Sequence, residues 1–265
     1  MKNRIDKTLT TAIELRNMVL APYITIGFPN LDSSVEIAEA VVDAGADMLE
    51  LGVPFSDPLA DGPTIQMTSY QALKQGVTVS ASLGAVRRLR SAKVNVPIAL
   101  LGYYNPYLRY GTEKFANDAA EAGVDGLIVP DLPPEEALQL QRECSAAGLY
   151  LIPLLAPTST DERIELACQG AGGFVYCVSV TGVTGARSEL RSGVVDLVGR
   201  IRQHTKLPII VGFGVSTGGH LKTISRFADG AIVGSALMNI VDSAPKGGEA
   251  RAAADFVIGL RATEG

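Results

Sequence analysis

The stretch that decides the fold is residues 48–64, which read MLELGVPFSDPLADGPT. It begins as a short apolar strand and continues into a loop that is rich in Pro and Gly. Alternation along the strand places Leu49 and Leu51 on one face and Glu50 on the other. A glutamate that faces an apolar interior is costly unless it is paired or protonated. We therefore expect Glu50 to have either a chemical function or a partner.

The length and composition of the chain favour a single α/β domain. The chain has 265 residues, of which 47% are hydrophobic and 19% are charged, and a (β/α)8 barrel is usually about 250 residues long. No linker or change of composition divides the sequence, so we expect one catalytic domain over residues 1–265. The net charge of −5 and the lack of Lys or Arg runs argue against nucleic acid as a partner. No apolar run approaches the roughly 20 residues of a membrane span.

The cysteines and histidines suggest neither disulfides nor a metal site. Cys144, Cys168 and Cys177 are odd in number and lack CxxC spacing, which is typical of reduced thiols in the cytosol. His204 and His220 fall in stretches expected on the outside, so we expect no metal. The first residues mix basic and acidic side chains and do not resemble a signal peptide. We expect a cytoplasmic protein, or a stromal one if a transit peptide has been removed.

Short apolar runs alternate with amphipathic stretches along the chain. The expected strands are 22–26, 48–52, 97–101, 126–129, 150–154, 173–178, 208–211 and 231–234. The expected helices are 33–44, 64–74 with 79–92, 112–122, 134–146, 160–170, 192–204, 217–226 and 249–262. Eight apolar strands, each followed by a helix, predict a single (β/α)8 TIM barrel, and residues 4–18 predict an extra N-terminal helix. A doubly wound open sheet is the alternative.

Three similar sequence motifs precede expected strands: AGAD at 44–47, AGVD at 122–125 and ADG at 228–230. Each predicts a helix end followed by a turn into the next strand.

Candidate active-site residues follow from the barrel itself, because active sites lie at the C-terminal ends of barrel strands. Glu50, Tyr103, Asp131 and Tyr176 end or follow expected strands. Two loops at this end are long, 53–62 and 179–191. We expect them to act as lids that exclude water, although they could simply be mobile.

Glycine-bearing turns at the same end predict an anion site. Backbone N–H groups at such turns, and at the start of a short helix, bind phosphate in many barrels. Close packing of helix on strand is the alternative interpretation. We expect one small phosphate ester held by backbone donors and Ser235, and the turns in question are Thr184-Gly185, Gly212–Ser216 and Gly234-Ser235, the last opening a helical stretch at 236–241.

The residue types at the strand ends limit the reaction mechanisms that are possible. No lysine stands at a C-terminal strand end, which argues against a Schiff base, and clustered histidines for a metal aldolase are lacking. Proton transfer by carboxylates is left, with Glu50 as general acid/base. Asp57 and Asp61 lie in Asp-Pro and Asp-Gly, which are ordinary turn signals.

Residues 50–63, ELGVPFSDPLADGP, resemble the signature of the tryptophan synthase α subunit. Supporting pieces are GYYNP at 102–106, PDLP at 130–133, GVTG at 182–185 and GFGVS at 212–216. The resemblance covers essentially the whole chain in the right order. It implies retro-aldol cleavage of indole-3-glycerol phosphate to indole and glyceraldehyde 3-phosphate, without a cofactor in this chain.

The resemblance also implies roles for single residues. Glu50 resembles the acid/base that protonates indole C3 and takes the proton of the glycerol hydroxyl. Asp61 resembles the carboxylate that holds the indole N–H. The remaining pocket residues are expected to be Tyr176, Tyr23, Leu101, Tyr103, Phe213 and Thr184, and the phosphate cradle is expected to be Gly185, Gly214, Gly234 and Ser235. Two positions depart from the family pattern: Val180 stands where a basic residue is common, and Tyr23 where phenylalanine is.

The family further implies an αββα complex with a β subunit that carries pyridoxal phosphate. Asp57, Asn105, Pro106 and Asp131 would then face the partner or form the lid. One alternative is a stand-alone indole-3-glycerol phosphate lyase that releases indole. Another is a non-catalytic subunit that only binds phosphate and activates its partner, against which Glu50 and Asp61 argue.

Overall fold

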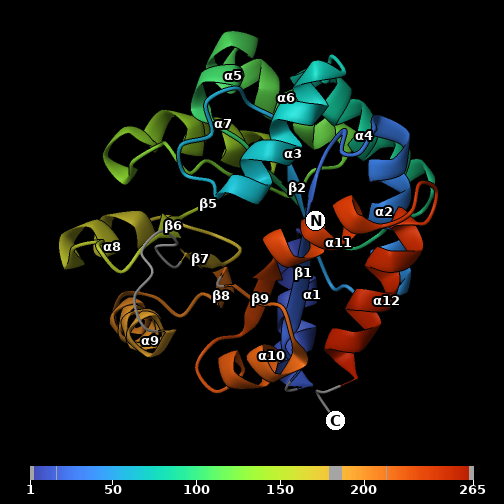
Figure 1. Cartoon of the computed structure of the whole chain (residues 1–265). Coiled ribbons are helices and arrows are strands. Elements are labelled where there is room, and N and C mark those ends of the chain that lie inside the picture. Colours follow the sequence, from blue (N-terminus) through green and yellow to red (C-terminus); the bar gives the residue numbers. More distant parts are fainter. Residues whose placement is uncertain (1–2, 16, 179–186, 213, 263–265) are drawn as a thin grey trace.

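Nine parallel strands form a nearly closed barrel surrounded by helices in the computed structural model (Figure 1). The structure describes residues 3–15, 17–178, 187–212 and 214–262. The order around the barrel is β5-β4-β3-β2-β1-β9-β8-β7-β6. The strands are β1 (Val19–Thr25), β2 (Leu49–Gly52), β3 (Ile98–Leu101), β4 (Gly126–Ile128), β5 (Tyr150–Ile152), β6 (Leu154–Leu155), β7 (Val175–Val178), β8 (Ile209–Gly212) and β9 (Gly230–Val233).

Pro153 explains why eight expected strands appear as nine. Residues 150–154 were predicted as one strand, but proline has no N–H for the ladder, so the strand is divided into β5 and β6. β5 pairs with β4 and β6 pairs with β7. The Pro153 carbonyl accepts a hydrogen bond from Tyr176 N at 2.9 Å across this junction. Because the first and last strands also pair, the ring is a barrel, and the alternative of an open doubly wound sheet is wrong.

Helices alternate with the strands as predicted, with two differences. Residues 134–146 are split into a 3₁₀ turn and a helix. Residues 104–110 form a helix that was not predicted, because Tyr, Asn and Pro are weak helix formers. The helices are α1 (Arg4–Glu14), α2 (Leu31–Asp43), α3 (Pro63–Lys74), α4 (Val79–Ser91), α5 (Tyr104–Tyr110), α6 (Thr112–Ala122), η1 (Pro134–Glu136), α7 (Leu138–Ala147), α8 (Asp161–Cys168), α9 (Arg187–His204), α10 (Gly218–Ile224), α11 (Ser235–Ser243) and α12 (Glu249–Arg261).

The N-terminal helix α1 packs against the N-terminal ends of the strands. Its Ile5 side chain is fully buried and lies 3.2 Å from where a Cβ on Gly126 would be. Asp6 accepts a hydrogen bond from the Tyr150 hydroxyl at 2.8 Å. The helix therefore lies at the end of the barrel opposite to the expected active site.

Three aspartates tie neighbouring strands together at this same end. They are the acidic residues of the three similar motifs that precede strands in the sequence. Each accepts a hydrogen bond from the first part of the adjacent strand and pairs with an arginine: Asp47 with Leu20 N and Arg261, Asp125 with Ile98 N and Arg90, Asp229 with Ile209 N and Arg202. Each motif thus supplies a turn and also an Asp–Arg pair that links two neighbouring strands, which we call an Asp–Arg clamp.

Asp125 makes the most buried of these clamps. Its side chain is 4% exposed and that of Arg90 is 13% exposed, and their closest atoms are 2.8 Å apart. Arg90 also donates to the carbonyls of Gly123, Val94 and Val96. Burial lowers the pKa of Arg90 to about 10, although the charge of Asp125 opposes that change.

We expect Asp125→Asn to lower the free energy of unfolding by about 3 kcal/mol, because it leaves the buried Arg90 charge without its counter-charge. Urea unfolding measures this. The matched control is Asp32→Asn, since the Asp32–Arg88 pair is exposed and should be worth less than about 1 kcal/mol. Equal losses in the two variants would contradict the role given to burial.

Candidate active site

Glu50 points into the barrel from β2. Its side chain lies between Tyr23 of β1 and Ala99 of β3 in the strand register, and the residue is 1% exposed. Among the described residues, nothing hydrogen-bonds to its Oε1 atom. Burial, with a smaller contribution from the charge of Asp61, raises the pKa of Glu50 from 4.5 to about 8. Glu50 is therefore buried in the barrel, as predicted, and no described residue satisfies its Oε1 atom.

Asp61 reaches the same space from the loop that follows β2. The Tyr103 hydroxyl donates to Asp61 Oδ2 at 3.1 Å and accepts from Ala60 N at 3.0 Å. Burial raises the pKa of Asp61 to about 6, and the hydrogen bond from Tyr103 partly opposes that rise. Sequence reasoning treated Tyr103 only as a pocket residue, and the structure shows that it also holds the Asp61 carboxylate.

The base of the loop 53–62 is fixed to α3. The Ser69 hydroxyl accepts from Phe55 N and donates to Phe55 O, both at 2.9 Å. Gln66 Nε2 donates to Asp61 O at 2.8 Å. Leu59, by contrast, is 92% exposed at the tip. The hydrogen bonds fix where Asp61 enters the barrel, and the role of the loop as a lid stays a prediction.

Two tyrosines beside Glu50 lie over glycines of the neighbouring strands. A Cβ on Gly52 would lie 2.1 Å from the Tyr23 hydroxyl oxygen, and a Cβ on Gly212 would lie 2.4 Å from that of Tyr176. Both tyrosines are buried. Burial raises the pKa of each phenol, and the charges of Asp61 and Glu50 add to it. Glycine is required at both strand ends because the rings occupy the space of a side chain.

The predicted anion site lies beside Tyr23. Gly234 precedes α11, whose N-terminus has no side-chain cap, so its first backbone N–H groups lack intrahelical acceptors. The Tyr23 Cβ is 3.5 Å from where a Gly234 Cβ would be. Ser235 opens α11, which is longer than the helical stretch predicted at 236–241. Gly214 follows β8 with φ of 39°.

Some of the predicted residues lie elsewhere or cannot be placed. Thr184, Gly185 and Phe213 lie outside the residues that the structure describes, and so does Val180. Leu101 is buried at the end of β3. Asn105 and Pro106, expected to face the partner or to form the lid, lie in the first turn of the helix α5.

The rim residues surround the mouth of the barrel. Asp57 and Asn105 are exposed. Asp131 is exposed too, and its Oδ1 atom accepts from Tyr104 N at 2.8 Å, which ties the loop after β4 to the start of α5.

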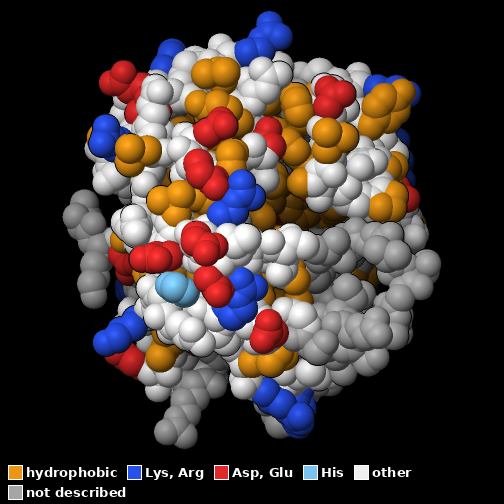
Figure 2. Space-filling view, turned by 90° about the vertical axis from the view of Figure 1, so that its left-hand side faces the viewer, with side chains coloured by type: hydrophobic (Ala, Val, Ile, Leu, Met, Phe, Trp, Pro, Cys, Tyr) orange, Lys and Arg blue, Asp and Glu red, His pale blue; other side chains and the backbone are white. Residues whose placement is uncertain are grey.

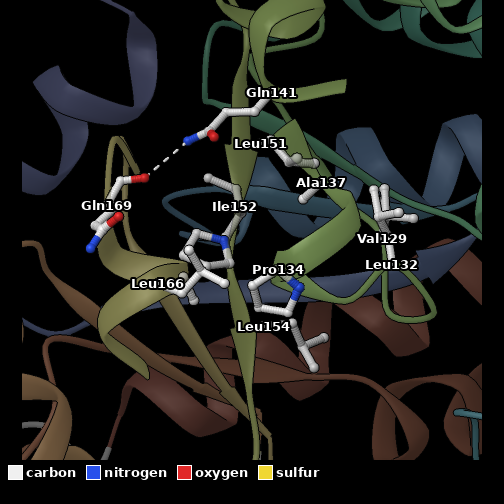
Figure 3. Close-up of a pocket in the computed structure, with 12 residues that line it drawn as sticks. Val129, Leu132, Pro134, Ala137, Gln141, Leu151, Ile152, Leu154, Leu166 and Gln169 are labelled. Atoms are coloured by element: carbon white, nitrogen blue, oxygen red, sulfur yellow. Dashed lines mark hydrogen bonds between the residues drawn. The ribbon is translucent and has the colours of Figure 1, made fainter. Parts of the chain in front are cut away.

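A separate hollow lies beside β5 and β6, between α7 and α8 (Figure 3). Gln141 Nε2 donates to Gln169 O there at 3.3 Å. None of its lining side chains titrates, so this hollow offers no group for acid–base chemistry. The lining residues are Val129, Leu132, Pro134, Ala137, Gln141, Leu151, Ile152, Pro153, Leu154, Leu166, Ala167 and Gln169.

Within the described ranges, no group of His, Cys, Asp and Glu is arranged to hold a metal ion. No helix in that part of the chain is long and apolar enough to cross a membrane. On the face shown in Figure 2, acidic and basic side chains are interspersed and do not form separate patches.

Comparison with known proteins identifies the lineage of this site. A family model described as "Tryptophan synthase alpha chain" matches residues 10–260. The chain belongs to the tryptophan synthase α chain family. It is therefore a carbon–carbon lyase of tryptophan biosynthesis.

Individual relatives are similar in sequence to this chain along nearly its full length. The tryptophan synthase α chain of Roseiflexus sp. strain RS-1 is 50% identical over 98% of this chain and 99% of its own length. The tryptophan synthase of Saccharomyces cerevisiae is 44% identical over 98% of this chain, which corresponds to 37% of that protein. A crystal structure of the α chain from Legionella pneumophila superposes with a TM-score of 0.90 at 38% identity, covering 99% of this chain and 97% of that one.

We expect Glu50→Gln to stabilise the protein at alkaline pH. The folded protein holds the Glu50 proton up to a pKa of about 8, whereas the unfolded chain loses it near 4.5. The folded state therefore binds more protons between these values, and its stability falls as the pH rises through them. Glutamine removes that loss, so the variant should be more stable than the parent by about 1–3 kcal/mol at pH 8.5.

Urea unfolding at pH 4.5 and 8.5 measures the effect. The two proteins should converge at the lower pH, and Glu36→Gln on the exposed face of α2 serves as the matched control. A Glu50→Gln advantage that does not grow with pH would contradict the burial of an ionisable proton at this position.

Proposed function

We propose that the barrel mouth cleaves indole-3-glycerol phosphate to indole and glyceraldehyde 3-phosphate, with Glu50 as acid and base and Asp61 as counter-charge. The observation that carries this assignment is the pair of buried carboxyl groups with separated pKa values, about 8 for Glu50 and about 6 for Asp61. Near neutral pH the first holds its proton while the second is largely ionised. Different environments thus give two carboxyl groups opposite tasks.

Glu50 transfers both protons of the reaction. In its protonated form it gives a proton to C3 of the indole ring, which places a positive charge on the ring. The resulting carboxylate takes the proton of the adjacent glycerol hydroxyl. The bond between C3 and the glycerol carbon then breaks, its electron pair returns to the ring, and the hydroxyl carbon becomes an aldehyde. The carboxyl group ends protonated, as it began.

Asp61 stabilises the charge that forms on the ring. An ionised carboxylate beside the indole N–H favours the protonated ring, and the effect is strong where water is excluded. The hydrogen bond from Tyr103 keeps this carboxylate in place. The phosphate group of the substrate would bind at the N-terminus of α11, next to Tyr23, with Gly214, Gly234 and Ser235. Gly185, expected in the same cradle, lies outside the described residues.

This chemistry needs no cofactor from the chain, because the protonated indole ring accepts the electron pair. We further propose that the product passes to a β subunit that carries pyridoxal phosphate, in an αββα complex. Support comes from the exposed rim residues Asp57, Asn105 and Asp131, and from Leu59, a large apolar side chain left 92% exposed at the mouth. Three free cysteines agree with the expectation of a reducing, cytoplasmic location.

Removing the proton carrier tests the mechanism. We expect Glu50→Gln to lower kcat for cleavage by at least about 1000-fold, since general acid–base catalysis is worth about 100- to 10,000-fold and one group serves two steps. Asp61→Asn should lower kcat less, by about 100-fold. Binding of an indole-propyl phosphate analogue, measured by calorimetry, should change less than threefold in Glu50→Gln. Full cleavage by a Glu50→Gln variant that binds the analogue normally would disprove the assignment.

Adding a tryptophan synthase β subunit tests the partner. We expect cleavage by the chain alone to be slow and to rise at least about tenfold on addition of a β subunit, because coupling free energies between sites are about 1–3 kcal/mol. Leu59→Asp should weaken this activation without changing the activity of the chain alone. Fast cleavage that no β subunit stimulates would instead identify a stand-alone lyase.

A further inference from the structure

The Tyr103 hydroxyl joins two neighbouring residues of the loop after β2. Its oxygen accepts a hydrogen bond from Ala60 N at 3.0 Å, and its proton is donated to Asp61 Oδ2 at 3.1 Å. A phenol has one proton to donate and can accept at the same time, so both hydrogen bonds can be made together. Tyr103 is 3% exposed, so bulk water has little access to this hydroxyl. The single phenol proton is therefore directed to the Asp61 carboxylate.

The Asp61 carboxylate depends on this donor. Within the described part of the chain, no cation and no second donor acts on it. Burial favours its neutral form, and the hydrogen bond from Tyr103 opposes burial, so that the pKa is about 6. The described groups that interact with the charge of Asp61 are all acids or phenols: Glu50 of β2, Tyr23 of β1, Tyr176 of β7 and Tyr103 itself.

Asp131 is the other acid near the Tyr103 phenol. Its charge acts on Tyr103 less strongly than that of Asp61 does. Asp131 Oδ1 accepts from Tyr104 N at 2.8 Å, and no hydrogen bond joins Asp131 to Tyr103 in the described structure. The Tyr103 proton thus has Asp61 as its acceptor.

The Tyr103 ring is held in place from α3. It stacks on the Phe55 ring, with the ring centroids 5.1 Å apart and the ring planes 29° from parallel. The hydroxyl of Ser69, a residue 4% exposed, accepts from Phe55 N and donates to Phe55 O, both at 2.9 Å. Because one hydroxyl holds both backbone groups of Phe55, Ser69 fixes the position from which the Phe55 ring contacts the phenol.

We propose that Tyr103 is a positioning residue that keeps Asp61 ionised for the indole N–H, and that Ser69 supports it by holding Phe55 against the Tyr103 ring. This inference rests on the proposed function and deepens it, because it explains how a buried counter-charge is charged before substrate binds. A donor to a carboxylate stabilises the ionised form over the neutral one. Since the phenol occupies Asp61 Oδ2, we assign the indole N–H to Oδ1.

The first test follows the Asp61 carboxyl in the ligand-free protein. The C=O stretch of the protonated acid is titrated by infrared difference spectroscopy, and Asp61→Asn and Glu50→Gln identify the two carboxyl bands. Tyr103→Phe keeps the stacked ring and removes the donor, so the Asp61 midpoint should move to higher pH, with a proton affinity about 3- to 10-fold higher. An unchanged or lower midpoint, or a shift confined to the Glu50 band, would overturn the proposal.

Tyr176→Phe separates this effect from a general change of the pocket. It deletes a second buried phenol whose pKa responds to the charge of Asp61 but which makes no hydrogen bond to that carboxylate in the described structure. The Asp61 midpoint should therefore shift less in Tyr176→Phe than in Tyr103→Phe. Equal shifts in the two variants would overturn the assignment to Tyr103.

Ser69→Ala tests the support from α3. Removing the hydroxyl frees the backbone of Phe55, so the Asp61 midpoint should move in the same direction as in Tyr103→Phe by a smaller amount. Ser82→Ala is the matched control, because Ser82 is a fully buried serine of α4 whose hydroxyl donates to the Thr78 carbonyl, away from this loop. No shift in Ser69→Ala, or an equal shift in Ser82→Ala, would overturn the role given to Ser69.

Kinetics supply the second readout. Because the proposed cleavage requires ionised Asp61, the acidic limb of the pH profile of kcat/KM should move to higher pH in Tyr103→Phe, while the alkaline limb, which Glu50 sets, should stay in place. A loss of kcat/KM by the same factor at every pH would show that Tyr103 only shapes the pocket and would overturn the proposal. If Asp61→Asn retains full cleavage, the proposed function fails, while the infrared titration still decides whether Tyr103 keeps Asp61 ionised.

Discussion

A carboxylic acid enclosed in an apolar barrel is the constraint on which the rest of this structure depends. Burial penalises the charged form of Glu50, so the group keeps its proton to a pKa of about 8. This buried acid lowers the free energy of unfolding as the pH rises, because the folded state holds a proton that the unfolded chain releases at lower pH. An acid poised in this way is suited to donate a proton at neutral pH and to recover one in the same turnover.

The strand order brings the chemical groups together. β1 pairs with both β2 and β9, so Tyr23 lies between Glu50 on one side and the Gly234 turn on the other. The proposed acid and the helix N-terminus proposed to bind phosphate are thereby placed next to each other, although 184 positions separate Glu50 from Gly234 in the sequence. Glycines at the strand ends leave room for the two tyrosine rings. The separation between Glu50 and the start of α11 is set by the pairing of adjacent barrel strands.

Stability and chemistry are placed at opposite ends of the barrel. The Asp–Arg clamps and α1 lie where the strands begin, and the carboxyl pair lies where they end. Rigid anchoring at one end allows the other end to carry a buried carboxyl oxygen without a partner among the described residues, and the loop 53–62 with its exposed Leu59. This division is the general arrangement of (β/α)8 barrels, and the three Asp-bearing motifs of this chain show how its sequence provides it.

The sequence by itself determined the periodic order of strands and helices, the inward direction of Glu50 and the turns that carry glycine, because these depend on local alternation and on residue preferences. The sequence also contains the motif at residues 50–63, and its resemblance to the family signature identified Asp61 as a candidate counter-charge and not only a turn residue. It did not reveal α5, the break at Pro153 or the loop–helix contacts of Asp61, since each depends on neighbours distant in the chain. Only the tertiary structure showed that Tyr103 holds Asp61, that Thr25 hydrogen-bonds to Tyr23, and that no described residue hydrogen-bonds to Glu50 Oε1. Hydrogen bonds between side chains of different strands and helices follow from closure of the barrel, and no local pattern in the sequence records them.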